Sequence, residues 1–319
     1  MQSESAPGRW WKITAVVSAV GLYLVNLVGF LDTITASALG CGPDWPLCNG
    51  KVIPNLNNVH TLIEFAHRSI VGFFAMWATI FMLALWWRYR AWREVRILSL
   101  VGIAFIFIQA ALGALAVVFV NPPSVLALHL GFGILGMEGP WLLTVFVFQL
   151  SRYSRGAPSG LAERAKGVDP ATRRALWGIW IYTYLAMYWG SYVAFRGGGE
   201  ACLTWPFCGF NGLAWMDWVH RGLALGLAVL STWLLVKLRI WAKGRQDLVR
   251  AGWALLVMVV VQILTGANLV WHRLATGPYL LHIATLMILF SVLSYLVMES
   301  YLPGRQGGLE APAIIPSRV

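Results

Sequence analysis

Long runs of apolar residues recur along the whole chain, separated by shorter segments that carry charges, glycine and proline. A helix needs about 20 apolar residues to cross roughly 30 Å of hydrocarbon at 1.5 Å per residue. The runs lack the short alternating pattern of barrel strands, so we expect helices. Eight spans are predicted, at residues 13–31, 62–87, 97–120, 125–150, 175–195, 215–236, 251–271 and 278–302.

The composition agrees with an integral membrane protein. Of 319 residues, 59% are hydrophobic and 12% are charged, well below the roughly 25% charged residues of soluble domains. Most Lys and Arg residues flank the spans on one side, which predicts a multi-pass protein of the cell membrane with both termini in the cytoplasm. The lipid bilayer explains the net charge of +11, so we expect no nucleic-acid partner.

A six-residue pattern of apolar, acidic, aromatic, small, His and Arg occurs at residues 63–68 and again at 216–221, 153 positions later. An internal repeat is considered first, because missing one leads to the wrong fold assignment. The same spacing relates Gln109 to Gln262, Gly113 to Gly266 and His129 to His282.

The repeat predicts an all-α integral membrane protein with eight transmembrane helices, arranged as two tandem four-helix bundles. Each half has an even number of spans, so the halves share one orientation and are related by a pseudo-twofold axis along the membrane normal. The expected divisions are a bundle at residues 1–150, a cytoplasmic linker at 151–174, a second bundle at 175–302 and a flexible cytoplasmic tail at 303–319.

Four histidines occupy equivalent depths in these spans, roughly 7 to 10 Å inside the outer ends. Two imidazoles at one depth in a four-helix bundle can bind a haem iron from opposite faces. Hydrogen bonding between helices is the alternative, whereas zinc is disfavoured because no third ligand repeats with each pair. The candidate iron ligands are His67 with His129, and His220 with His282.

Glu64 lies three residues before His67, on the same helical face. One interpretation is a carboxylate that moves protons beside a bound porphyrin. The other is a capping box in which Thr61 and Glu64 begin the second helix. Both interpretations fit the local sequence.

The second half carries the shorter acid Asp217 at the position equivalent to Glu64, so the two sites are expected to differ chemically. Arg68 and Arg221 follow these acids by four residues. They are expected either to pair with haem propionates or to extend to the membrane interface.

All four cysteines fall in two predicted outer loops that share the pattern Trp-Pro-x-Cys. The outer compartment permits disulfides, so we expect the bridges Cys41–Cys48 and Cys202–Cys208. The first bridge precedes the helix that bears Glu64, and an exposed or strained bridge can exchange electrons with thiols. A redox role and a purely structural role therefore both stay open for it.

Taken together, these motifs resemble the haem A synthase family over roughly residues 13 to 300. The resemblance is carried by Gly40-Cys41-Gly-Pro-Asp-Trp-Pro-Leu-Cys48-Asn-Gly, Glu64-x-x-His67-Arg68, Gln109-Ala-Ala-Leu-Gly113-Ala, His129, the second cysteine pair, His220-Arg221, Gln262-x-x-x-Gly266 and His282.

That resemblance implies oxidation of the C8 methyl group of haem O to a formyl group, giving haem A for terminal oxidases. It implies haem b as cofactor, haem O as substrate, an unidentified electron acceptor, and haem O synthase as a candidate partner. The implied residues are His67 and His129 for the substrate haem, His220 and His282 for haem b, Glu64 as the catalytic acid, and Cys41 with Cys48 as a catalytic redox pair.

Two other classes of protein fit part of the pattern. A quinol-linked electron carrier with two b-type haems would use both histidine pairs alike, and the difference between Glu64 and Asp217 disfavours it. A transporter with duplicated halves would use the histidines to bind substrate or protons.

Overall fold

The computed structural model describes residues 7–43, 45–153, 168–210, 212–242 and 245–301, and these residues form an all-α protein. The single β-type contact among them is an isolated bridge between Cys48 and Lys51. The helices are α1 (Arg9–Ile34), α2 (Val59–Arg88), α3 (Arg93–Val118), α4 (Pro123–Tyr153), α6 (Pro170–Phe195), α7 (Ala214–Trp241), α8 (Gln246–Trp271) and α9 (Thr276–Glu299).

Seven of the eight described helices are long and apolar enough to cross a membrane. The exception is α6, which was predicted as a span at 175–195. Its 26 residues suffice in length, but it carries Arg173 and Arg174 near its start and is rich in Trp and Tyr. The chain is therefore an all-α membrane protein, with seven helices that meet both criteria of length and hydropathy.

The helices extend beyond the predicted apolar runs, because a helix continues into its charged flanks. The predicted linker is helical at both ends, where α4 includes residues 151–153 and α6 includes 170–174.

The side chain of Asp169 caps α6 by accepting a hydrogen bond from the Thr172 N–H at 2.9 Å. Hydrogen bonds from Thr172 also lower the pKa of the Asp169 carboxyl below its ordinary value. The predicted tail, residues 303–319, lies outside the described residues.

Helix bounds repeat along the chain. The bounds of α3 and α8 are 153 residues apart at both ends, and the bounds of α1 and α6 are 161 residues apart at both ends. The turn after α3 and the turn after α8 also match, since each has two consecutive residues with positive φ. These pairs are Val120 with Asn121, and Arg273 with Leu274.

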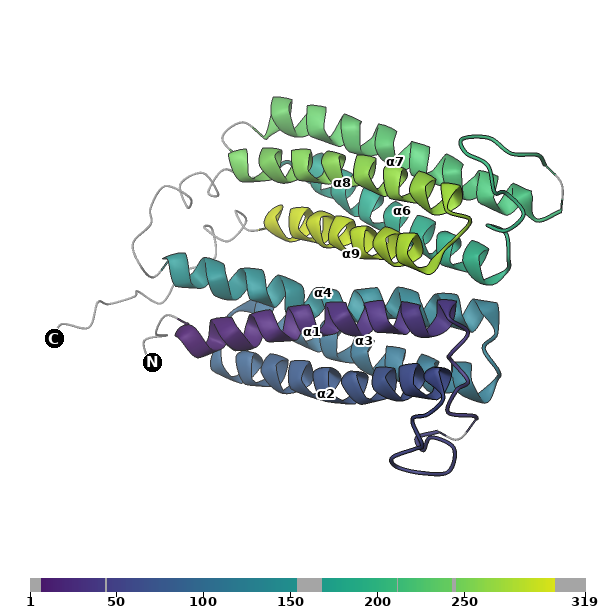
Figure 1. Cartoon of the computed structure of the whole chain (residues 1–319). Helices are drawn as coiled ribbons and strands as arrows, with labels where there is room; N and C mark the ends of the chain where they lie inside the picture. Colours follow the sequence, from purple (N-terminus) through teal and green to yellow (C-terminus); the bar gives the residue numbers. More distant parts are fainter. Residues whose placement is uncertain (1–6, 44, 154–167, 211, 243–244, 302–319) are drawn as a thin grey trace.

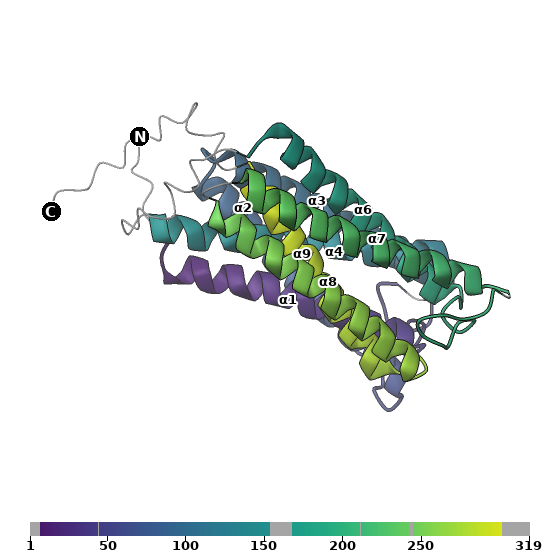
Figure 2. The same ribbon diagram turned by 90° about the horizontal axis from the view of Figure 1, so that it is seen from above.

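Two groups of four helices lie side by side (Figure 1). Within one group, α1 contacts α2 and α4, and α3 contacts α4; within the other, α7 contacts α6 and α8, and α8 contacts α9. The groups meet where α4 packs on α6 and α9, and where α1 packs on α9. In both views the two cysteine-containing loops lie at one end of the molecule, opposite the start of α1 and the end of α9 (Figure 2).

One apolar core extends across the contact between the groups. It joins Leu130 and Ile134 of α4 to Met287 and Phe290 of α9, all of them buried. The α4 helix is the most buried of the seven candidate spans, whereas fewer than a third of the positions in the apolar windows of α2, α3, α7 and α8 are buried. These exposed helices present the apolar surface that a bilayer covers.

Candidate haem-binding site

Each of the four predicted histidines is half-buried and lies against a glycine of a neighbouring helix. A Cβ at any of these glycines would lie 2.6–3.2 Å from an imidazole atom, which is too close for ordinary packing. The missing side chains therefore make room for the rings. The pairs are His67 with Gly29 of α1, His129 with Gly113 of α3, His220 with Gly190 of α6, and His282 with Gly266 of α8.

In the first half, the geometry fixes the protonated nitrogen of His129. Its Nδ1 lies 2.9 Å from the carbonyl oxygen of Gln109, and a carbonyl can only accept a hydrogen bond. Nδ1 therefore carries the proton, and Nε2 keeps the lone pair that a metal needs.

In the second half, His282 is held by hydroxyl and amide groups. The Thr265 hydroxyl donates to the carbonyl of Gln262 at 3.1 Å, and its oxygen lies 3.1 Å from Nδ1 of His282. The side-chain amide nitrogen of Gln262, which can only donate, lies 3.2 Å from Nδ1 and 3.2 Å from Nε2 of the same ring, so both ring nitrogens of His282 have partners in this structure. His220 differs, because its buried Nδ1 has no hydrogen-bond partner among the described residues.

The two remaining histidines, His60 and His272, have partners of their own. His60 Nδ1 lies 2.9 Å from the hydroxyl of Ser37, and His272 Nδ1 lies 2.9 Å from the carbonyl oxygen of Asn268.

Glu64 connects α2 to the first cysteine loop. Its side chain is buried, and Oε2 accepts a hydrogen bond from the backbone N–H of Cys41 at 2.6 Å. Oε1 accepts from Nη2 of Arg68 at 2.5 Å, and Arg68 also donates through Nη1 to the carbonyl of Leu47 at 2.7 Å. The acid and the arginine together hold the loop against the first turns of α2.

The predicted capping box at the start of α2 is wrong. The helix begins at Val59, and its N-cap is Asn58, whose side chain accepts from the His60 N–H at 2.9 Å. Thr61 instead donates to the carbonyl of Gly40 at 2.7 Å. Glu64 is therefore free of any role in capping the helix.

The second half repeats the acid–arginine arrangement. Asp217 pairs with Arg221 at 2.6 Å, and Arg221 donates to the carbonyls of Thr204, Pro206 and Cys202 at 2.7–3.2 Å. The two arginines thus bind loop carbonyls and acids in this structure, a third possibility beside the two expected from the sequence.

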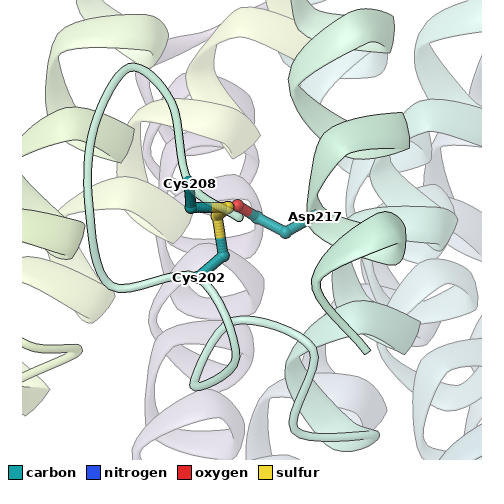
Figure 3. A group of neighbouring side chains, drawn as sticks. All are labelled: Cys202, Cys208 and Asp217. Carbon is teal, nitrogen blue, oxygen red and sulfur yellow. A yellow bond between two sulfur atoms is a disulfide. The ribbon is translucent and has the colours of Figure 1, made fainter. Parts of the chain in front are cut away.

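Both cysteine pairs form disulfides, Cys41 with Cys48 and Cys202 with Cys208, as predicted. The second bridge lies beside the carboxylate of Asp217, with one donor atom of each residue within 4.8 Å of the others (Figure 3). Sulfur atoms joined in a disulfide are not thiolates, which are the form of cysteine that binds metals. This cluster is therefore a contact between loop and helix in the bonded state.

Comparison with known proteins decides the family. A family model described as a cytochrome oxidase assembly protein, COX15-CtaA, matches residues 12–294. Haem A synthases of Bacillus cereus (strain 03BB102) and Bacillus anthracis (strain CDC 684 / NRRL 3495) are each 32% identical over 296 residues, covering 91% of this chain and 93% of theirs. The chain belongs to the haem A synthase family. This confirms the family that the motifs indicated.

Membership in the haem A synthase family implies a haem-related ligand, and the residues fit one. Nε2 of His129 keeps its lone pair, the buried Nδ1 of His220 has no partner in the described chain, and a glycine lies beside each of the four rings. Imidazoles on the helices of a four-helix bundle are a type of donor suited to haem iron.

Several residues of this haem A synthase site were not singled out from the sequence. Gly29 and Gly190 are 161 positions apart, the spacing that also relates Cys41 to Cys202, so a search at that second spacing would have found them. Asp32 and Thr265 contact the histidines only through tertiary packing.

Proposed function

We propose that this chain is a haem A synthase of the cell membrane that oxidises the C8 methyl group of haem O to the formyl group of haem A. The observation that carries this proposal is a difference between two similar sites. Both halves present two histidines beside glycines, but only the first places a glutamate, Glu64, against the backbone of a disulfide-bonded cysteine, Cys41.

In this proposal His67 and His129 bind haem O, and His220 and His282 bind haem b. The hydrogen bond from Nδ1 of His129 to the carbonyl of Gln109 would orient this ring and keep Nε2 unprotonated, the form that binds iron. Thr265 and Gln262 are the residues that would orient the ring of His282. When bound, haem b would supply a one-electron acceptor.

Glu64 is the proposed proton acceptor. Converting a methyl group and one water into a formyl group releases four electrons and four protons, so the site needs a base as well as an electron acceptor. Each carboxylate oxygen has two lone pairs, and the bonds from Cys41 and Arg68 each occupy one. The carboxylate is therefore held in place while it keeps capacity to accept a proton.

The proposed architecture is two four-helix bundles, residues 1–150 and 175–302, related by a pseudo-twofold axis along the membrane normal. The repeated helix bounds and the repeated turns after α3 and α8 support it. The cysteine loops would face the outside and both termini the cytoplasm, where most Lys and Arg residues then lie. An electron acceptor and haem O synthase are the proposed partners.

Haem extraction from the purified protein, followed by identification of haems b, O and A, tests the function. We expect haem b together with haem O or haem A from cells that make haem O. Haem b alone, without conversion of haem O, would instead support an electron carrier with two b-type haems. Protein without haem absorbance would support a transporter.

Single ligand variants test the assignment of the two sites. We expect His220→Ala to lose haem b and His67→Ala to lose the substrate haem. His272→Ala is the matched control, because His272 binds the carbonyl of Asn268 at the end of α8. Loss of the same haem from both ligand variants would contradict the assignment.

A further inference from the structure

Asp32 is a buried acid in the last turn of α1, and the proposed mechanism gives it no role. Its side chain is 7% exposed, and Oδ1 has no hydrogen-bond partner among the described residues. A buried carboxylate without compensating hydrogen bonds is costly in a membrane protein. The residues around Asp32 should therefore explain why a carboxylate is buried there.

The group facing Asp32 is the imidazole of His67. Oδ2 of Asp32 lies 3.5 Å from Nδ1 of His67, and Gly29, one helical turn earlier in α1, lies against Nε2 of the same ring. An acid of α1 therefore faces Nδ1 of His67, and the absence of a side chain at Gly29 leaves space beside Nε2. Arg68, the neighbouring cation, is directed to Glu64 and to Leu47.

The second half lacks this acid. Gly190 faces His220 as Gly29 faces His67, and the spacing of 161 residues that relates the two glycines places Val193 opposite Asp32. Val193 is buried and apolar. The unpartnered Nδ1 of His220 agrees with this substitution.

We propose that Asp32 is a positioning residue that fixes His67 with its proton on Nδ1 and makes the haem of the first half the easier one to oxidise. This inference rests on the proposed function only in taking His67 as an iron ligand. A carboxylate at Nδ1 of a ligating histidine orients the ring and raises its basicity. A more basic axial ligand and a nearby negative charge both stabilise ferric iron over ferrous iron.

The consequence is a direction for electron transfer. When both sites hold a haem, an electron would move from the iron beside the carboxylate to the iron of the site that has valine in its place. The C8 methyl group, and not the iron, becomes the formyl group, so the carboxylate would set only the direction in which the two irons exchange electrons.

The test compares Asp32→Asn with the wild-type holoprotein by spectroelectrochemical titration, with the first-half signal assigned by its loss in His67→Ala. At a fixed potential, we expect the ferric-to-ferrous ratio of the first-half haem to fall about tenfold. This corresponds to a rise of about 59 mV in its reduction potential for one electron. The reduction potential of the second-half haem should not change. Glu200→Gln, which removes an exposed acid of the other loop, is the control. An unchanged first-half potential would overturn the inference.

A second measurement keeps the inference testable if the variant does not fold. In haem-free wild-type protein, ¹⁵N NMR reports which nitrogen of His67 is protonated, with the signal assigned by its absence in His67→Gln. We expect Nδ1–H, and Nε2–H would overturn the inference. Wild-type protein that never binds haem in its first half would overturn the proposed function itself, whatever the NMR result.

Discussion

Glu138 of α4 accepts a hydrogen bond from the hydroxyl of Ser291 of α9 at 2.9 Å, and the two residues are 153 positions apart, the spacing of the internal repeat. Positions that the repeat makes equivalent are thus in direct contact between the two helix groups. This is the contact expected at an axis of pseudo-twofold symmetry. Trp141 adds a second link by donating to the carbonyl of Ser291 at 3.3 Å.

Ser291→Ala should destabilise the contact between the two helix groups. It leaves the buried Oε1 of Glu138 without this donor, and a lost partner of that kind costs roughly 1–3 kcal/mol. Thermal unfolding in detergent measures the effect. Ser231→Ala is the control, because the buried Ser231 hydroxyl has no partner among the described residues. Equal destabilisation by both changes would contradict the role of the hydrogen bond.

Glu64→Gln should abolish most haem A formation while haem content stays normal. Glutamine retains an oxygen that can accept from the Cys41 N–H but cannot take up a proton at neutral pH. Loss of a general base costs about 10²–10⁴-fold in rate. Asp217→Asn is the matched control in the second half and should affect the rate much less. Full haem A yield from Glu64→Gln would refute the catalytic role.

Gly190→Ala should lower haem b binding. The added methyl group would lie 2.6 Å from Cε1 of His220 and displace the ring. Overpacking of this kind costs roughly 1–3 kcal/mol, so we expect about a tenfold loss of affinity, measured by haem absorbance per protein. Gly178→Ala in the same helix meets nothing within 4 Å and should bind haem b normally.

The two disulfides should differ in their effect on activity. Removing either short-loop bridge costs about 2 kcal/mol of stability. The double variant of Cys41 and Cys48 to serine should also lose most activity, because this loop holds the carboxylate of Glu64. The double variant of Cys202 and Cys208 serves as control. Equal loss of activity in both, with equal loss of stability, would indicate that both bridges are only structural.

The sequence singled out Glu64, Arg68 and Arg221, but it could not predict which groups their side chains contact. A Thr-x-x-Glu pattern is compatible with a capping box wherever the helix begins, and α2 begins at Val59, before Thr61. The interpretation of Arg68 and Arg221 likewise depended on where the loops fold. A sequence does not give the position of a loop carbonyl such as that of Leu47.

The sequence by itself determined the helices, the duplication, the four histidines, the cysteine pairs and the family. The reason is that bilayer thickness fixes the length of an apolar span, and a repeat preserves spacing whatever the packing. Only the tertiary structure decided that Cys41 meets Glu64, that Asp32 faces His67 and that Glu138 binds Ser291. These contacts join positions 23 to 153 residues apart, and they depend on how helices rotate against one another, which hydropathy alone does not specify.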